Sequence, residues 1–350
     1  MNKTFFTRTK TSRPGTVALG IATITCLALS ACSGGGTSSS TGGDDKVVIG
    51  QSLPTLDNPW YAAFSEGSKD MAEALGAELN LVTNPATNAY DPSAQLNAIE
   101  NLIAKRPDVI QIDPTSTDGI NGAIEEARNQ GIPVITDGIY VSTEVDASVV
   151  ADNKQGGELA GKFVAETLKS GGNVAVLEGT PGRDIIQQRQ DGFKAGISAN
   201  AGAKIVASQI ANLSREEGQT VAENILQANP QLGAMWGASD TMALGALEAL
   251  KSRSMQGKVV LGGFDGTPEA FQAIKDGDMS FTIDQVPYEM GAVSIALAYL
   301  KATEGQFEQK TILETKLVSS ENVDDYLSNE EAKRKETLDS VLKKYNLQAK

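Results

Sequence analysis

The chain has 350 residues, a net charge of −14 and 40% hydrophobic residues, a composition typical of globular proteins. It contains no histidine and two cysteines, which excludes a Ser-His-Asp triad, a Cys-His dyad and a histidine metal site. No basic cluster occurs after the N-terminal segment, so nucleic acid is not expected as a partner. We also expect no cofactor and no metal ion.

The first 31 residues have the features of an export signal. Basic residues precede an apolar stretch, 17–29, that is too short to span a membrane as a mature helix. The stretch ends in Leu29-Ser30-Ala31-Cys32, which resembles a bacterial lipobox, where cleavage leaves Cys32 as the lipid-carrying N-terminus. An ordinary secretory signal with an incidental cysteine is the alternative. Residues 32–45 form a Gly/Ser-rich tether with an average reach of about 20 Å. We therefore expect an extracytoplasmic protein that a lipid anchors to the bacterial cell membrane.

From residue 46, short runs rich in Val and Ile alternate with longer stretches of helical period. The runs span residues 46–52, 78–83, 108–113, 132–136, 148–152, 173–179, 204–209, 233–238, 258–265 and 279–285. Near-continuous apolar strands separated by helices specify parallel sheets that are covered on both faces. We predict an α/β fold with two sheets, because one sheet of ten strands would be unusually wide. The predicted break lies near residues 151–153, and a cleft between two such lobes would bind ligand at the carboxyl ends of the strands.

Polar and aromatic side chains follow most of the predicted strands. They are Asn58, Trp60, Tyr61, Asp113, Asp137, Arg189, Ser239, Asp265 and Gln285. Carboxylates accept hydrogen bonds, arginine donates them and amides do both, a mixture that suits a ligand rich in hydroxyl groups. Aromatic faces suit the apolar face of a sugar ring.

Each of these residues also has an ordinary structural interpretation. An aspartate at a strand end can cap the next helix, and Asp265 can belong to a turn that opens a helix at Pro268. Arg189 can lie on a solvated helical face. Trp60 and Tyr61 are adjacent, so they point in different directions on a helix and one of them can belong to the core.

Eight segments carry a resemblance to a known family. They are "NPWYAAFSEG", "QIDPTSTDGI", "GIPVIT", "ADNKQGGELAG", "QRQDGF", "SDTMALGALEAL", "GGFDGTPEA" and "TIDQVPYEMG". In this order they resemble the ribose-type periplasmic sugar-binding proteins, the solute receptors of bacterial ABC importers. The resemblance extends over about residues 46–318. It implies two Rossmann-like lobes with parallel central sheets, joined by a three-segment hinge, with the ligand in the cleft between them.

The resemblance also implies the lobe boundaries. Residues 46–151 and 286–313 would form the first lobe, and 152–285 with 314–350 the second. The chain would cross between the lobes near residues 151–152, 285–287 and 313–314. Beyond residue 318 lies an extension, in which we expect Ser328 to cap a charged helix that ends near Tyr345 on the outside of a lobe.

Several residues acquire roles from the resemblance. Asn58 falls on a ligand-binding amide, Trp60 and Tyr61 on two stacking aromatics, Arg189 on an arginine that bonds sugar hydroxyls, Asp265 on the ligand aspartate, and Gln285 on a glutamine at a crossing. Asp113 matches a position that is usually Asn. Asp137 fits an aspartate of the first lobe only if one residue is deleted; otherwise Gly138 falls there.

The departures from the family pattern concern the ligand. Ser239 replaces an Asn of ribose binders, Leu213 replaces a third aromatic residue, and Pro54 stands where a small hydroxyl residue is common. Together with the acidic residues, these changes argue against a pocket identical to that for ribose. A polyol, a cyclitol or a different aldose would fit.

The function implied by the resemblance is capture of a monosaccharide or polyol by hinge closure and delivery to an ABC permease. The protein is then not an enzyme, and a monomer is the family default. The alternative is that the same receptor serves as a ligand sensor for a membrane kinase or chemoreceptor. A glycosidase is not favoured, because no carboxylate pair in the chain has a distinctive motif.

Overall fold

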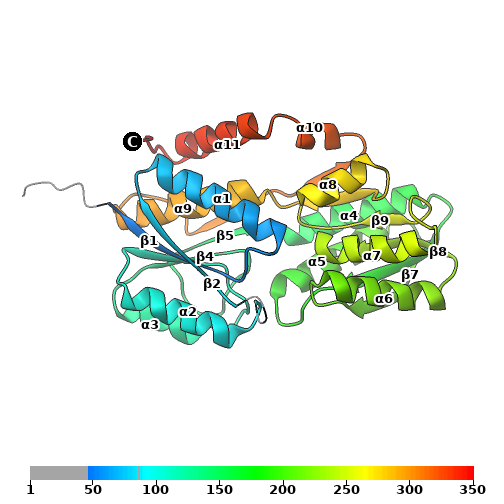
Figure 1. Ribbon diagram of the computed structural model, residues 1–350, viewed down its shortest axis with the longest axis horizontal. Helices are drawn as coiled ribbons and strands as arrows, with labels where there is room; N and C mark the ends of the chain where they lie inside the picture. Colours follow the sequence, from blue (N-terminus) through cyan, green and yellow to red (C-terminus); the bar gives the residue numbers. More distant parts are fainter. Residues whose placement is uncertain (1–45, 86, 88) are drawn as a thin grey trace, which may run out of the picture. The chain divides into compact units, whose positions relative to one another are not determined.

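The computed structural model describes residues 46–85, 87 and 89–350 (Figure 1). The expected signal (1–31), Cys32 and the tether (32–45) lie outside these residues. The described part contains two six-stranded sheets flanked by helices, which confirms the predicted α/β fold with two sheets. All ten predicted runs contain strands. Across the described residues, no helix is long and apolar enough to cross a membrane.

The first sheet is entirely parallel. Its strands are β1 (Val48–Leu53), β2 (Glu78–Thr83), β3 (Val109–Ile112), β4 (Val134–Asp137), β5 (Ala147–Ala151) and β11 (Lys310–Leu313). They lie in the order β11-β5-β4-β3-β1-β2. Helices α1 (Pro59–Ala74) and α9 (Pro287–Ala302) cover one face, and α2 (Pro92–Ala104) and α3 (Asn121–Asn129) cover the other (Figure 1). This sheet and these four helices are called the first lobe.

The second sheet is parallel except for one strand. Its strands are β6 (Gly172–Glu178), β7 (Ala203–Ile210), β8 (Leu232–Gly237), β9 (Val260–Gly262), β10 (Phe281–Asp284) and β12 (Lys316–Ser319). They lie in the order β12-β10-β9-β8-β6-β7, and only β12 is antiparallel to its neighbour. The helices packed on it are α4 (Asn153–Thr167), α5 (Asp184–Ile197), α6 (Arg215–Ala228), α7 (Asp240–Ser252), α8 (Pro268–Lys275) and α10 (Val323–Leu327). This assembly is called the second lobe.

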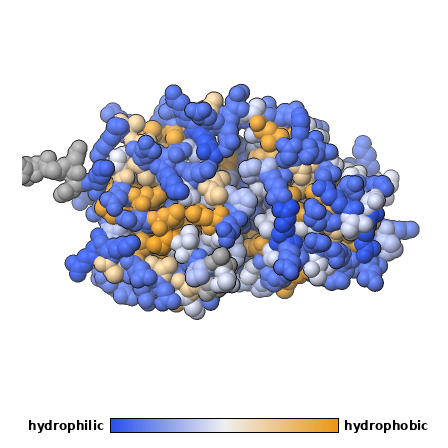
Figure 2. Space-filling view, viewed as in Figure 1, coloured by the Kyte–Doolittle hydropathy of each residue, from blue (hydrophilic) through white to orange (hydrophobic). Residues whose placement is uncertain are grey.

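The edges of both sheets are less covered than their centres. All residues of β3, β4 and β5 are buried, whereas β2, at the edge, is only partly buried. Figure 2 shows hydrophobic residues gathered on the face of the first lobe where β1 and β2 lie, among mostly hydrophilic surroundings. At the edge of the second sheet, β7 exposes Val206 and Ile210. The central strands are thus part of the hydrophobic core, and polar side chains lie at the ends of the strands.

Glycines allow α4 and α5 to pack closely. A Cβ added to Gly157 of α4 would lie 2.1 Å from the carbonyl oxygen of Arg189, and one on Gly192 of α5 would lie 2.1 Å from that of Lys154. No side chain fits at either position. The glycine-rich stretch at the start of α4 therefore serves helix packing, and it fixes the backbone of α5 at Arg189.

The chain passes between the two sheets at three places. β5 of the first sheet leads into α4, β10 of the second leads into α9, and β11 of the first leads into β12. The strands β11 and β12 were not among the predicted runs. Both are four residues long, and β11 alternates exposed and buried residues, so neither forms an apolar run in the sequence.

The C-terminal extension differs from the expectation in two ways. Assignment of all residues 314–350 to the second lobe is wrong, because α11 (Glu330–Lys344) packs on α9 and α1 of the first lobe and buries Val341 in that core. The chain therefore returns to the first lobe after α10. Ser328 does not cap α11: its hydroxyl donates to the carbonyl oxygen of Asp325, and the helix follows Asn329, which has a left-handed conformation.

Candidate functional site

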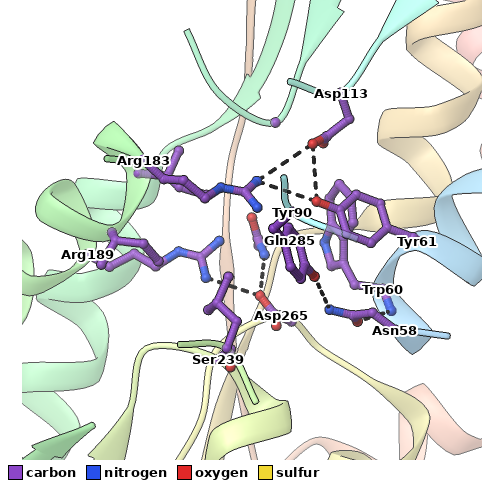
Figure 3. A pocket seen from close by; sticks show the side chains of 14 residues that line it. Asn58, Trp60, Tyr61, Tyr90, Asp113, Arg183, Arg189, Ser239, Asp265 and Gln285 are labelled. Atoms are coloured by element: carbon purple, nitrogen blue, oxygen red, sulfur yellow. Dashed lines mark hydrogen bonds and ion pairs between the residues drawn. The ribbon is translucent and has the colours of Figure 1, made fainter. Parts of the chain in front are cut away.

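A pocket lies between the two lobes at the carboxyl ends of strands from both sheets (Figure 3). It is lined by Asn58, Trp60, Tyr61, Tyr90, Asp113, Gly138, Arg183, Ile185, Ile186, Arg189, Leu213, Ser239, Asp265 and Gln285. The structure thus places every expected site residue except Asp137 at this pocket. They meet there because parallel strands present their carboxyl ends at one edge of each sheet.

The first lobe supplies an aromatic wall. Trp60 and Tyr61 are in contact edge to face, with ring centroids 4.9 Å apart, and Tyr90 lies 6.3 Å from Tyr61. Behind the wall, Trp60 stacks on Phe64, and Asn58 donates to the Tyr90 hydroxyl at 3.3 Å. Both adjacent rings therefore line the pocket, and Trp60 also belongs to the core. Its indole Nε1 is buried without a hydrogen-bond partner.

Asp113 follows β3 and is buried at the pocket. The Tyr61 hydroxyl donates to its Oδ1 at 3.1 Å, whereas its Oδ2 has no N–H or hydroxyl partner. Burial raises the pKa of Asp113 to about 6, and the charge of Arg183 opposes this rise. The Arg183 guanidinium favours the ionised carboxylate, which can accept a hydrogen bond from a ligand.

Asp137 lies behind the pocket instead of lining it. It is fully buried, and Gly138 lines the pocket in its place, as the alternative alignment allowed. Gly138 has a φ of +68°, and a Cβ there would lie 2.2 Å from Oδ2 of Asp113. Burial, followed by the neighbouring charge of Asp113, holds the pKa of Asp137 well above its ordinary value. This shift favours the neutral form of Asp137 beside the Asp113 carboxylate.

In the second lobe, Arg189 and Asp265 form a buried ion pair. Arg189 Nη1 lies 3.2 Å from Asp265 Oδ1 and donates to the carbonyl oxygen of Ala238, while its Nε donates to Asn153. The guanidinium also lies 4.0 Å from the centroid of the Phe264 ring. Arg189 therefore lies on a buried helical face, and its contacts hold it in one position.

Asp265 is fixed by the strand on its other side. Gln285, at the crossing after β10, donates to Asp265 Oδ1 at 2.6 Å. Asp265 has a φ of 128°, an unusual value for a residue other than glycine, and such strain is often found at functional sites. Burial raises its pKa to about 6, and the charge of Arg189 opposes the rise. The turn interpretation is also correct, since Thr267 caps α8 and Pro268 begins it.

Asn58 and Ser239 serve both the fold and the pocket. The Asn58 side chain accepts from the Trp60 amide at the start of α1, and the Ser239 hydroxyl accepts from the Met242 amide at the start of α7. Both side chains also line the pocket. The ordinary helix-cap interpretation is therefore correct at these positions, and it is compatible with a lining role.

Sequence reasoning missed two polar or aromatic members of the lining, Tyr90 and Arg183. Tyr90 precedes α2 in the loop after β2, so it also follows the carboxyl end of a strand. Arg183 follows the turn Pro181-Gly182, in which Gly182 has a φ of +85°, and it precedes α5. Its guanidinium extends to the first lobe, 3.6 Å from Asp113 and 3.4 Å from the Tyr61 hydroxyl. The position of Arg183, a few residues after the end of strand β6, was the feature of the sequence that could have indicated a site residue.

The charges at the pocket are balanced. Arg183 faces Asp113 and Arg189 faces Asp265, so two cations meet two carboxylates (Figure 3). Burial, followed by the neighbouring charge of Asp265, also raises the pKa of Asp240 to about 8. A ligand with a net charge would leave one charge unpaired in a buried place, at a cost of several kcal/mol. Within the described ranges, no group of three or more acidic side chains is placed to hold a metal ion.

Two α/β lobes with a polar and aromatic pocket between them define a two-lobe binding protein, in which closure encloses a small ligand. The profile of the periplasmic binding protein domain matches residues 49–306. The chain belongs to the periplasmic binding protein family, in its ribose-type branch, which confirms the resemblance seen in the sequence.

Known relatives agree in length and fold. The ribose import binding protein RbsB of Bacillus subtilis is 36% identical over 275 residues, which cover 78% of this chain and 87% of the relative. A periplasmic solute-binding protein of an ABC transporter from Actinobacillus succinogenes, solved with bound D-allose, is 31% identical with a TM-score of 0.77, over 80% of this chain and all of that chain. A solute-binding protein from Bacillus halodurans with bound myo-inositol is 28% identical with a TM-score of 0.74, over 81% and 98% of the two chains.

Proposed function

We propose that this protein is an extracytoplasmic solute receptor that binds one uncharged monosaccharide or polyol and delivers it to an ABC importer. The observation that carries the proposal is the pocket between the lobes, where two arginine–carboxylate pairs face an aromatic wall. The relative named for ribose import and the neighbours that hold D-allose and myo-inositol support the same class of ligand.

The mechanism is binding followed by closure. Asp113 and Asp265 would accept hydrogen bonds from ligand hydroxyls, and Arg183 and Arg189 would donate to them. Trp60 and Tyr61 would cover the apolar face of the ring. Each hydrogen bond to a charged group contributes about 1.5–3 kcal/mol. A micromolar complex needs about 8 kcal/mol, so a few such bonds are sufficient after the costs of ordering. No step changes a covalent bond, and the protein acts as a receptor, not as an enzyme.

A screen of ligands by thermal unfolding tests this proposal. A ligand at 100 times its Kd stabilises a one-site protein by about 2.7 kcal/mol. We expect pentoses, hexoses, polyols or cyclitols to raise the melting temperature. Sugar acids and amino sugars serve as charged controls, and the balanced pocket should not accommodate them. A rise with amino acids or peptides and none with any hydroxylated compound would contradict the proposal.

We further propose that Cys32 carries a lipid that holds the receptor at the outer face of the cell membrane, where it acts as a monomer. The lipobox-like sequence and the tether that follows it support this anchor. Replacing Cys32 by Ser should move the protein from the membrane fraction to the soluble fraction of cells. Fractionation with an antibody against the protein measures the change, and a variant that stays with the membrane would disprove the anchor.

A further inference from the structure

Arg183 connects the two lobes across the pocket. It belongs to the second lobe, at the N-terminal end of α5, whereas Asp113, Tyr61 and Tyr90 belong to the first. Its Nη2 donates to the Tyr61 hydroxyl at 3.4 Å, and that hydroxyl donates to Asp113 at 3.1 Å (Figure 3). The guanidinium also lies 5.4 Å from the centroid of the Tyr90 ring. Of all ion pairs in the described part of the chain, Arg183–Asp113 is the one that joins the two lobes.

The surrounding contacts place Arg183 where the lobes meet. Ile139 of the first lobe packs with Ile185 and Ile186 of the second in one small buried cluster. Beside it, the Thr117 hydroxyl donates to the carbonyl oxygen of Gly182 at 3.5 Å. The segment 182–186 of the second lobe thus contacts the first lobe. A hinge motion that opens the lobes must separate Arg183 from Asp113, because the two residues are fixed to different sheets.

The buried atoms of this pair have unused hydrogen-bonding capacity toward the pocket. Arg183 Nε is buried without a partner. Asp113 Oδ2 has no N–H or hydroxyl partner, although the Asp137 carboxyl lies beside Asp113, and both Arg183 and Asp113 line the pocket. One is a donor and the other an acceptor. A hydroxyl group both accepts and donates, so one hydroxyl or two neighbouring hydroxyls can satisfy both atoms. An apolar group or a lone carbonyl cannot.

We propose that Arg183 is a specificity-determining residue that also stabilises the closed form, through its ion pair with Asp113 across the cleft and its contact with a ligand hydroxyl. This inference rests on the proposed function for its ligand and adds a residue that the family resemblance did not provide. Truncation of Arg183 removes the cation that balances Asp113, so closure then buries an unpaired carboxylate.

The ion pair is tested by the distance between the lobes without ligand. Spin labels on Asn101→Cys of α2 and Asn224→Cys of α6 lie on exposed positions of the two lobes. Cys26→Ser and Cys32→Ser remove the native cysteines, both of which precede residue 46. We expect Arg183→Gln to shift the distance distribution toward longer values and Arg183→Lys to shift it less. The control Arg215→Gln removes an exposed ion pair with Glu269 inside the second lobe and should leave the distribution unchanged.

The ligand contact is tested by titration calorimetry with D-ribose, D-allose and myo-inositol as probes. Arg183→Gln should lower the affinity of a bound probe roughly 10- to 100-fold. Asp113→Asn should also lower it, and the double variant should lose less than the product of the two single losses, because the residues form one pair. Arg183→Lys keeps the charge and should recover part of the affinity. Arg215→Gln should bind within about twofold of the wild type.

The outcomes separate this inference from the proposed function. If probes bind the wild type, and Arg183→Gln changes neither affinity nor interlobe distance beyond the control, the role of Arg183 is wrong and the receptor function stands. If no probe and no other hydroxylated compound binds the wild type, both the proposed function and the ligand contact of Arg183 are wrong. The distance measurement alone then tests whether Arg183 stabilises the closed form. A melting curve of each variant identifies loss of folding, and Arg183→Lys then replaces Arg183→Gln.

Discussion

Replacing Arg189 by Ala should abolish measurable ligand binding and also lower the free energy of unfolding by about 3–5 kcal/mol. The second effect follows because the guanidinium is buried and paired with Asp265 at 3.2 Å. Its removal leaves that carboxylate, the side-chain oxygen of Asn153 and the carbonyl oxygen of Ala238 without their donor. Breaking a buried pair on one side typically costs this much. Titration calorimetry and urea unfolding of the same preparation measure the two effects.

The matched control for Arg189 is an arginine whose ion pair is exposed. Arg215→Ala removes a pair with Glu269 in which both side chains are about half exposed, at 46% and 50%. Such pairs contribute about 0–1 kcal/mol, so this variant should fold and bind as the wild type does. A variant Arg189→Ala that melts and binds like Arg215→Ala would contradict the assignment of Arg189 to both the core and the site. The sequence left open that Arg189 lies on a solvated helical face, and its burial excludes this interpretation.

Replacing Trp60 by Ala should weaken ligand binding roughly 10- to 150-fold, the equivalent of about 1.5–3 kcal/mol of buried apolar surface. The ring lines the pocket beside Tyr61, and it also stacks on Phe64 with centroids 5.5 Å apart. The substitution should therefore destabilise the fold as well, by about 3–5 kcal/mol. Calorimetric titration and chemical unfolding report the two losses separately.

Phe64→Ala is the control that distinguishes the two roles of Trp60. Phe64 is fully buried beneath Trp60 and does not line the pocket. Its truncation should cost similar stability, about 3–5 kcal/mol, but a smaller share of the affinity. Equal losses of affinity in Trp60→Ala and Phe64→Ala would mean that Trp60 acts only through packing and that the aromatic wall does not touch the ligand.

The fold could be predicted because its strands are continuous apolar runs. Buried strands such as β3 and β5 need Val and Ile on both faces, and this pattern is visible in the sequence. The hinge strand β11 exposes alternate residues, so no run marks it. The helix α11 is highly charged, and its few buried contacts, chiefly at Val341, give no sign of which lobe it joins. Its place is decided by tertiary contacts with α1 and α9.

Site residues could be predicted where their position at the end of a strand places them at the pocket. They were harder to predict where a long side chain has to extend to the pocket. Asp113 directly follows strand β3, and Asp265 lies shortly after strand β9. The topology of the sheets brings both residues to the cleft. Asp137 and Gly138 are neighbours in the sequence. A shift of one residue along a strand is enough to turn a side chain from the pocket to the core. Arg183 reaches the other lobe through a tight turn at Gly182 and a long side chain, and neither is encoded in a hydrophobic pattern.

The central claim, that a hydroxylated ligand binds against the aromatic wall between the lobes, is tested most directly by tryptophan fluorescence. The protein has two tryptophans: Trp60 at the pocket, and Trp236, which is fully buried and stacked on Phe193. Titration of the wild type with a sugar or polyol that raises its melting temperature should change the emission with one-site saturation. In Trp60→Phe the change should vanish, although calorimetry should still detect binding. An emission change that persists undiminished in Trp60→Phe would place the ligand away from this wall and contradict the account.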